Sequence, residues 1–337
     1  MVVRVPATSS SKIRAGLVGT GSYLPSQVLS NADLAEMVDT TDEWIRERTG
    51  IRERRLAASD ESTSTLATVA AKRACVNANL DPSELDLIIV ATVTQDHQCP
   101  SVSCLVQNGI GATNAAAFDM QAACTGFIYG MNVASGLIKS GLHENVMVIG
   151  ADTLTRFVDY TDRGTCILFG DGAGAAILRP KLDGSGILYS RVRANGAQSD
   201  LIRIPAVRAK VAASGEPLPA DPSYIQMEGR QVFKFATTVF VELIEEAMTA
   251  CGLSREDVNL VVPHQVNRRI IESALGKLKI PIERCFINLE WYGNTSSASV
   301  PIALDEARSQ NQIKSGDIVV MLAFGSGLTW GVTVMKA

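Results

Sequence analysis

The 337-residue chain lacks several features that would point to particular classes of protein. No hydrophobic run approaches the length of a membrane span, and the first 12 residues hold no apolar segment of signal-peptide type, so we expect a cytoplasmic protein without membrane contact. The net charge is only −4, from 31 basic and 35 acidic residues, which argues against a nucleic-acid partner. Any anionic partner must therefore meet a local basic patch.

Signals for metals and disulfides are equally scarce. Only three histidines occur, and the seven cysteines (75, 99, 104, 124, 166, 251 and 285) include no CxxC pair. We therefore expect no zinc site, no disulfide framework and no cofactor. What the chain does have is 46% hydrophobic residues, which is typical of a well-buried globular protein of two domains or one large duplicated domain.

Apolar strand-like runs alternate with helical segments, which predicts an α/β protein. We read 87–93 and 146–150 as buried strands, and 31–38, 64–79 and the stretch from Ser101 as helices. Residues 13–24 read as a strand running into a glycine-rich turn. Gly19-Thr20-Gly21 invites a phosphate-loop reading, but the dinucleotide pattern would need a glycine at Leu24, so a turn is favoured.

The second half of the chain repeats the first. Several apolar positions between Ala74 and Ile88 recur 173 residues later, and Ile138-Lys139-Ser140-Gly141 recurs at 313–316. We therefore predict two duplicated halves, 13–180 and 181–337, after an N-terminal extension at 1–12. Residues 208–222 are rich in Ala, Pro and Gly and predict a surface excursion.

The most informative single residue is Cys124. A strand-like run ends just before it and helical spacing begins after it, which places the thiol at a strand-to-helix elbow. The N-terminus of a helix favours thiolate over thiol, so Cys124 is a candidate nucleophile. The alternative is one more buried core cysteine.

Two polar residues of the second half could share a site with Cys124. His264 closes the predicted strand 260–262, at the end where α/β sites form. Asn294 lies in the segment that the repeat aligns with the Cys124 elbow. Taken singly, His264 could be a structural histidine and Asn294 could simply hold a turn.

Five motifs together resemble the β-ketoacyl-acyl-carrier-protein synthase III group of the thiolase superfamily. They are Ala-Ala-Cys-Thr-Gly-Phe at 122–127, Gly-Asp-Gly-Ala-Gly-Ala at 170–175, Pro-His-Gln-Val-Asn at 263–267, Trp-Tyr-Gly-Asn-Thr-Ser-Ser-Ala-Ser at 291–299 and Phe-Gly-Ser-Gly-Leu-Thr-Trp-Gly at 324–331. The resemblance implies a five-layer αβαβα thiolase-like fold and a homodimer. It also implies that an acyl-CoA primer condenses with malonyl-acyl carrier protein, releasing CoA and carbon dioxide and initiating fatty acid biosynthesis.

The chemistry of that reaction assigns roles to the three candidates. Cys124 would carry the acyl group, while His264 and Asn294 would donate hydrogen bonds to the enolate oxygen left by decarboxylation. The backbone N–H groups of Cys124 and Ser326 are candidates for the oxyanion hole of the first step.

The residues that contact the substrates are assigned from the resemblance alone. It implies CoA contacts from Trp44 and Arg163 on the adenine, Arg48 near the phosphates, and Asn267 and Gly229 along the pantetheine. The implied acyl pocket includes Cys99 and Phe169. A basic patch for the carrier protein would comprise Lys234, Arg268, Arg269 and Lys277, although a solvated helix face is an equal alternative for Arg268 and Lys277.

Two departures from the family pattern concern the pocket and the oxyanion turn. Many members have three glycines where this chain has Gly325-Ser326-Gly327. Members restricted to short primers often carry a bulky Phe where this chain has Cys99, so we hypothesise room for primers longer than acetyl.

Three other functions stay open at this stage. A related condensing enzyme of secondary metabolism would share the same triad. A thiolase would need a second cysteine within 324–327, and a hydroxymethylglutaryl-CoA synthase would need a glutamate base; neither is found. A catalytically inactive scaffold subunit is disfavoured because all three catalytic residue types are present.

Overall fold

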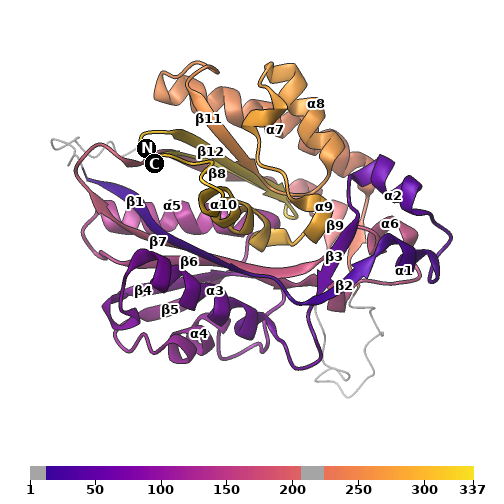
Figure 1. Cartoon of the computed structure of the whole chain (residues 1–337), viewed down its shortest axis with the longest axis horizontal. Coiled ribbons are helices and arrows are strands. Elements are labelled where there is room, and N and C mark those ends of the chain that lie inside the picture. Colours follow the sequence, from indigo (N-terminus) through magenta and orange to yellow (C-terminus); the bar gives the residue numbers. More distant parts are fainter. Residues whose placement is uncertain (1–12, 206–223) are drawn as a thin grey trace.

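The computed structural model describes residues 13–205 and 224–337, and it forms five layers (Figure 1). The predicted extension at 1–12 and the predicted excursion at 208–222 lie outside the described residues. The first sheet has the order β1-β7-β6-β4-β5, built from Arg14–Tyr23, Asp171–Lys181, Val146–Thr153, Leu87–Ala91 and Ala116–Met120. The second has the order β11-β12-β13-β8, built from Val258–Pro263, Ile318–Gly325, Thr329–Lys336 and Gly186–Ala194.

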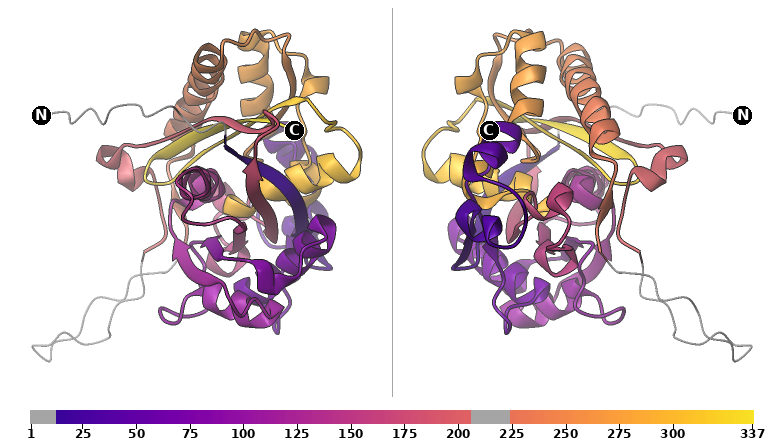
Figure 2. Two further views of the ribbon diagram at one scale, coloured as in Figure 1. Left: turned by 90° about the vertical axis from the view of Figure 1, so that its left-hand side faces the viewer. Right: turned by 90° about the vertical axis from the view of Figure 1, so that its right-hand side faces the viewer.

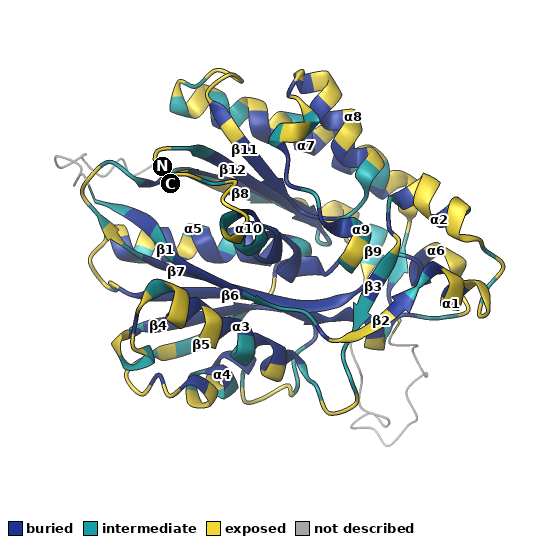
Figure 3. Ribbon diagram, in the orientation of Figure 1, coloured by how far each residue is buried: buried dark blue, intermediate teal, exposed yellow. Residues whose placement is uncertain are grey.

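Helices occupy the other three layers. Helices α3 (Thr63–Ala78) and α4 (Val102–Ile110) cover the outer face of the first sheet, and α7 (Gly229–Cys251) and α8 (Arg268–Leu278) cover that of the second. Figure 2 shows these two outer layers at opposite ends of the molecule. Helices α5 (Gly126–Lys139) and α10 (Ser299–Ser309) lie between the sheets, where their apolar faces join one core with both (Figure 3).

The two sheets share one topology, which bears out the duplication. Strands β1, β7, β6 and β4 of the first correspond in order to β8, β13, β12 and β11 of the second. Strand β4 runs parallel to β6, and β11 runs parallel to β12 in the same way. The next pairs, β6 with β7 and β12 with β13, are antiparallel, as are the last pairs, β7 with β1 and β13 with β8. The second sheet has no full counterpart of β5 among the described residues. In its place, Cys285 forms a single parallel bridge with Val261 of β11. The predicted thiolase-like fold is therefore confirmed.

Smaller elements gather near one end of the sheets. They are β2 (Gln27–Ser30), β3 (Glu53–Leu56), α1 (Asn31–Ala35), α2 (Asp42–Thr49), α6 (Arg163–Cys166), α9 (Leu289–Tyr292), β9 (Ile202–Arg203) and β10 (Gln226–Met227). Ser30 caps α1 through a capping box with Asp33, as expected, but the helix ends three residues before the predicted Val38. Ser101 caps α4.

The glycine-rich turn predicted at 19–21 is wrong. Gly19 and Gly21 lie inside β1, paired with β7. A Cβ built on Gly21 would lie 2.4 Å from the backbone nitrogen of Ala74, and one on Gly19 would lie 2.6 Å from the Ala74 carbonyl oxygen. These glycines are needed because α3 packs directly onto the strand.

Strand β5 forms an edge of the first sheet, since only β4 pairs with it. None of its five residues is buried, whereas all five residues of β4 are, and Phe118 is 39% exposed to solvent. Among the described helices, none combines the length and the hydropathy that a membrane crossing would need.

Candidate active site

The Cys124 elbow has the predicted geometry. Strand β5 ends at Met120, a 3-10 turn η2 covers Ala123–Thr125, and α5 begins at Gly126. Ala123 has a φ of +46°, an uncommon conformation for a non-glycine residue, so the chain turns sharply just before the cysteine. A Cβ on Gly126 would lie 2.7 Å from the Cβ of Ala91, so the glycine lets the elbow approach β4.

His264 follows β11 directly and is buried. Its backbone N–H donates to the Leu322 carbonyl at 2.8 Å, and its ring edge meets Phe324 with centroids 5.8 Å apart. Nδ1 lies 2.6 Å from Ser299 Oγ, which accepts a bond from the Gln265 N–H at 3.4 Å. The Ser299 proton is thus free to point at Nδ1, and in this tautomer Nε2 carries the ring proton.

Asn294 is held in one orientation. Its Oδ1 accepts the Ser296 N–H at 2.9 Å, which leaves the side-chain NH₂ as a donor. The backbone of Asn294 also bridges to Phe169, with the Gly170 N–H donating to its carbonyl at 3.0 Å. Asn294 and the Nε2 side of His264 therefore both present hydrogen-bond donors.

A chain of contacts joins the three residues. A Cβ on Gly325 would lie 3.1 Å from Cys124 Sγ, so the end of β12 touches the nucleophile. The neighbouring Phe324 meets His264. On the other side, the 3-10 turn at 296–298 packs against the turn at 123–125 that carries Cys124, and the Ser296 N–H holds the Asn294 side chain. Cys124, His264 and Asn294 are therefore linked through neighbouring residues near the carboxyl ends of the two sheets.

Protonation at the site differs from the sequence expectation. Burial lowers the pKa of His264 to about 3, so the imidazole is neutral near pH 7. Cys124 was expected to favour thiolate, but enclosure of its sulfur raises the pKa of the thiol to about 12. The nearby Ser296 hydroxyl lowers this pKa, and the Asp152 carboxylate raises it further. Desolvation outweighs the helix terminus, so Cys124 rests as a thiol.

Two residues that the sequence reasoning missed contact this site. Asp152 is fully buried at the end of β6, and Ser296 is buried with a φ of +51°. Asp152 could have been noticed as a lone carboxylate ending the apolar run 146–151, a strand that was predicted to stop at Gly150. No sequence signal distinguishes Ser296 from the other hydroxyls of the 295–299 run.

Strand β6 and the turn that follows Asn294 also meet through backbone alone. A Cβ built on Gly150 would lie 2.1 Å from the carbonyl oxygen of Ser297. Strand β6 of the first half therefore touches the turn that follows Asn294 in the second half, with no side chain between them.

The predicted oxyanion turn lies beside the nucleophile. Gly325 contacts Cys124, and the carbonyl of Ser326 accepts a bond from Thr329 Oγ1 at 2.9 Å. Thr329 Oγ1 also reaches the Ala122 carbonyl at 3.0 Å. Thr329 therefore ties the 325–327 turn to the segment that carries Cys124.

The predicted CoA residues fall into two groups. The guanidinium groups of Arg48 and Arg163 stack on Trp44, at 4.5 and 4.7 Å from its ring centroid. Asn267 instead caps α8 through the Arg269 N–H, and its Nδ2 donates to the Arg48 carbonyl at 3.0 Å. Gly229 is exposed at the start of α7.

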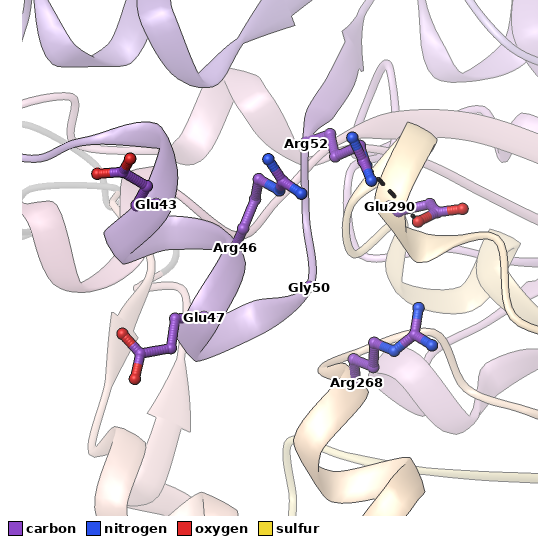
Figure 4. Close-up of a pocket in the computed structure, with 7 residues that line it drawn as sticks. All are labelled: Glu43, Arg46, Glu47, Gly50, Arg52, Arg268 and Glu290. Carbon is purple, nitrogen blue, oxygen red and sulfur yellow. Dashed lines mark ion pairs between the residues drawn. The ribbon is translucent and has the colours of Figure 1, made fainter.

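The predicted carrier-protein residues lie on neighbouring helices. Lys234 on α7 and Arg269 and Lys277 on α8 are exposed. Arg268 pairs with Glu272 at 2.7 Å and lines a cavity of about 470 Å³ between α2, α8 and α9 (Figure 4). Neither Cys124 nor its two partners line that cavity.

The two predicted acyl-pocket residues differ in burial. Phe169 is buried beside Asn294, whereas Cys99 is exposed before a cis peptide bond to Pro100. A group of three or more His, Cys, Asp or Glu side chains able to hold a metal is not found within 13–205 and 224–337.

Comparisons with known proteins match these features. Residues 118–196 match the family described as 3-oxoacyl-[acyl-carrier-protein (ACP)] synthase III, and residues 248–337 match its C-terminal family. The β-ketoacyl-[acyl-carrier-protein] synthase III of Caldanaerobacter subterraneus subsp. tengcongensis is 51% identical over 96% of this chain and 98% of its own. Crystal structures of the corresponding synthases from Aquifex aeolicus and Thermus thermophilus both have a TM-score of 0.89. They are 47% and 40% identical, each covering 96% of this chain, and the alignments span 100% and 99% of theirs.

Proposed function

Because this chain belongs to the β-ketoacyl-acyl-carrier-protein synthase III family, we propose that it joins an acyl-CoA primer to malonyl-acyl carrier protein through an acyl-Cys124 intermediate. It is an acyltransferase of fatty acid biosynthesis. The alternative in secondary metabolism is not favoured, since the relatives named above carry the name of the initiating synthase. The observation that supports the mechanism is that residues 324 and 325 contact His264 and Cys124, while Asn294 is held with its NH₂ as a donor.

In the first half-reaction, Cys124 attacks the thioester carbonyl of the primer. The backbone N–H groups of Cys124 and Ser326 stabilise the oxyanion, and CoA leaves. The close contact of Gly325 with the cysteine supports this assignment, because it brings the 325–327 turn to the reacting sulfur.

In the second half-reaction, malonyl-acyl carrier protein loses carbon dioxide. His264 Nε2–H and the Asn294 NH₂ donate to the enolate oxygen that forms, and the enolate carbon attacks the acyl-Cys124 carbonyl. A neutral histidine suits this role, since it acts as a donor and needs no proton from solvent.

The substrate contacts are part of the same proposal. Trp44, Arg48 and Arg163 would hold the CoA nucleotide, with Gly229 and Asn267 along its arm, while Lys234, Arg269 and Lys277 would face the acidic carrier protein. Arg268 contributes less, because Glu272 already pairs with it. The reaction uses CoA thioesters in the cytoplasm and no further cofactor.

We propose a homodimer that pairs the open edge strand β5 of two copies. An edge strand with an exposed Phe118 is a template for pairing with another chain. The loop of Cys99 would then complete the partner's acyl pocket beside Phe169, and the small thiol would admit primers longer than acetyl.

Intact mass after incubation with acyl-CoA tests the proposal. Wild type and Cys124→Ala are each incubated with acetyl-, isobutyryl- and octanoyl-CoA without carrier protein. We expect wild type to gain one acyl group and Cys124→Ala to gain none. Acylation of the variant, or none of wild type, would reject Cys124 as the nucleophile, and acylation by acetyl-CoA alone would reject the wider pocket.

A further inference from the structure

Arg54 is a fully buried arginine that the proposed mechanism does not use. It lies in β3, and its guanidinium donates to three neutral oxygens. These are the Leu29 carbonyl at 3.3 Å, Asn31 Oδ1 at 2.8 Å and the Ile167 carbonyl at 2.6 Å. Burial lowers the pKa of Arg54 to about 10, so the group is still charged near pH 7. Burying a cation among neutral acceptors is costly, which points to a role that an apolar side chain could not fill.

Asn31 connects Arg54 to both ends of helix α2. Because a guanidinium only donates, its bond to Asn31 Oδ1 turns the buried Asn31 NH₂ the other way. That NH₂ donates to Asp42 Oδ1 and to the Ile51 carbonyl, both at 2.8 Å. Asp42 is the first residue of α2, and Ile51 follows its C-cap Gly50. One amide, oriented by Arg54, therefore holds the start and the end of α2.

The other arm of the guanidinium holds helix α6. Nη2 of Arg54 donates to the carbonyl of Ile167, the residue that directly follows α6. Nη1, which bonds Asn31, belongs to the same rigid planar group. Arg54 therefore sets the distance between the amide that holds α2 and the carbonyl at the end of α6.

The two helices carry the proposed nucleotide clamp, which consists of Trp44, Arg48 and Arg163. Trp44 and Arg48 lie on α2, Arg163 begins α6, and the two helices lie at the same end of the molecule (Figure 1). Both guanidinium groups stack on the Trp44 ring. At the surface, Arg163 Nη1 also donates to the Asp39 carbonyl at 2.7 Å. Because stacking depends on how the ring and the cation are placed, a shift of α6 against α2 would change the clamp.

The position of Arg54 also ties the clamp to the segment that carries Asn294. A Cβ built on Gly170 would lie 3.2 Å from the Arg54 Cβ, and one built on Gly293 would lie 3.3 Å from it. These glycines adjoin Phe169 and Asn294, which form a bridge. The side chain that holds α2 and α6 therefore begins directly behind that bridge.

We propose that Arg54 is a positioning residue for acyl-CoA. Through Asn31 and the Ile167 carbonyl it keeps α2 and α6 at the spacing that the nucleotide of the substrate needs. The inference rests on the proposed CoA contacts of the nucleotide clamp. Because Arg54 is fully buried, it acts through the two helices and does not touch the substrate. It serves the nucleotide end of acyl-CoA and has no part in the chemistry of the thioester.

Two thioesters separate this role from a general loss of structure. Acetyl-CoA carries the nucleotide, whereas acetyl-pantetheine has the same reactive end without it. Acylation of Cys124 is followed by rapid quench and intact mass over a range of concentrations of each thioester. We expect Arg54→Met to lower the second-order rate constant for acetyl-CoA about 3- to 30-fold and that for acetyl-pantetheine less than about twofold.

Asp42→Ala breaks the same chain of contacts from the surface, so it decides the question even if Arg54→Met fails to fold. The Asp42 side chain is 49% exposed, and its removal takes one acceptor from the Asn31 NH₂. We expect a loss of about 3- to 10-fold with acetyl-CoA and less than about twofold with acetyl-pantetheine. Glu43→Ala removes the other acidic residue in the first turn of α2, and Arg55→Met removes the next arginine of β3. Both controls should keep the wild-type rate constants.

The outcomes distinguish this inference from the proposed function. Equal slowing with the two thioesters in Arg54→Met and Asp42→Ala would overturn the inference in favour of a purely structural role. Unchanged rate constants in Asp42→Ala, or the same selective loss in either control, would overturn it as well. Trp44→Ala is measured beside them. A selective loss with acetyl-CoA in Trp44→Ala alone would overturn only the inference, whereas wild-type rate constants in Trp44→Ala would overturn the proposed CoA contacts themselves.

Discussion

Removing the Ser299 hydroxyl should slow decarboxylation while leaving acylation nearly unchanged. Ser299 Oγ lies 2.6 Å from His264 Nδ1 inside the protein, so it is the hydrogen-bond partner of that ring nitrogen. Leaving a buried polar atom without its partner costs about 1 to 3 kcal/mol. If this free energy adds in full to the activation barrier, Ser299→Ala should slow decarboxylation by about 5- to 150-fold.

The two half-reactions can be measured separately. Carbon dioxide release from malonyl-acyl carrier protein is followed in a Cys124→Ala background, where no acyl transfer competes. Acylation by acetyl-CoA is followed by intact mass in Ser299→Ala with Cys124 intact. Because His264 is neutral over the whole range, decarboxylation should also stay flat between pH 5 and 8.

A buried serine outside the group of Cys124, His264 and Asn294 provides the control. Ser103 on α4 is fully buried and bonds the Ser101 hydroxyl at 2.9 Å, so Ser103→Ala loses a comparable contact. It should leave both half-reactions unchanged. The reasoning would be refuted if Ser299→Ala slowed acylation and decarboxylation by the same factor, or if decarboxylation kept its wild-type rate.

Three further outcomes follow from contacts described above. Trp44→Ala should raise KM for acetyl-CoA about 5- to 30-fold, because it removes the ring that lies between Arg48 and Arg163. The control Trp291→Ala, which removes a tryptophan stacked with Arg52, should leave KM unchanged. Equal KM values in the two variants would contradict the CoA assignment. The double variant Arg269→Glu with Lys277→Glu should lower kcat/KM for malonyl-acyl carrier protein at least about tenfold at low salt, and less at high salt. The control Arg255→Glu should leave this kcat/KM unchanged. Gly21→Ala should lower the free energy of unfolding by about 1 to 3 kcal/mol in urea melts because α3 leaves no room, while Gly136→Ala on an open helix face should raise it by about 0.5 to 1 kcal/mol.

Helices and strands could be predicted from the sequence where the residues of one short segment determine its structure. Apolar runs marked the buried strands β4 and β6, and hydroxyl caps marked the starts of α1 and α4. The turn predicted at Gly19 and Gly21 was wrong because a glycine can mark either a turn or a place where a helix packs closely on a strand. The difference lies in α3, whose contact residue Ala74 comes 53 residues after Gly21 in the chain (74 − 21).

The site was predictable in its residues and less so in its protonation. Cys124, His264 and Asn294 stand at strand ends and turns, which sequence can place. The thiol pKa depends on how closely Ser296, Asp152 and Gly325 enclose the sulfur, and these come from three distant segments. A helix terminus is visible in sequence, whereas desolvation is a property of the assembled site.

The contact between Gly150 and the Ser297 carbonyl fixes strand β6 of the first half against the turn that follows Asn294 in the second half. Because backbone meets backbone there, the spacing between that strand and that turn does not depend on any rotamer. Under the proposed mechanism, side chains around the substrate could therefore change to suit other primers without moving the turn that carries Asn294. Primer preference and the placement of that turn would then be separate properties of the protein.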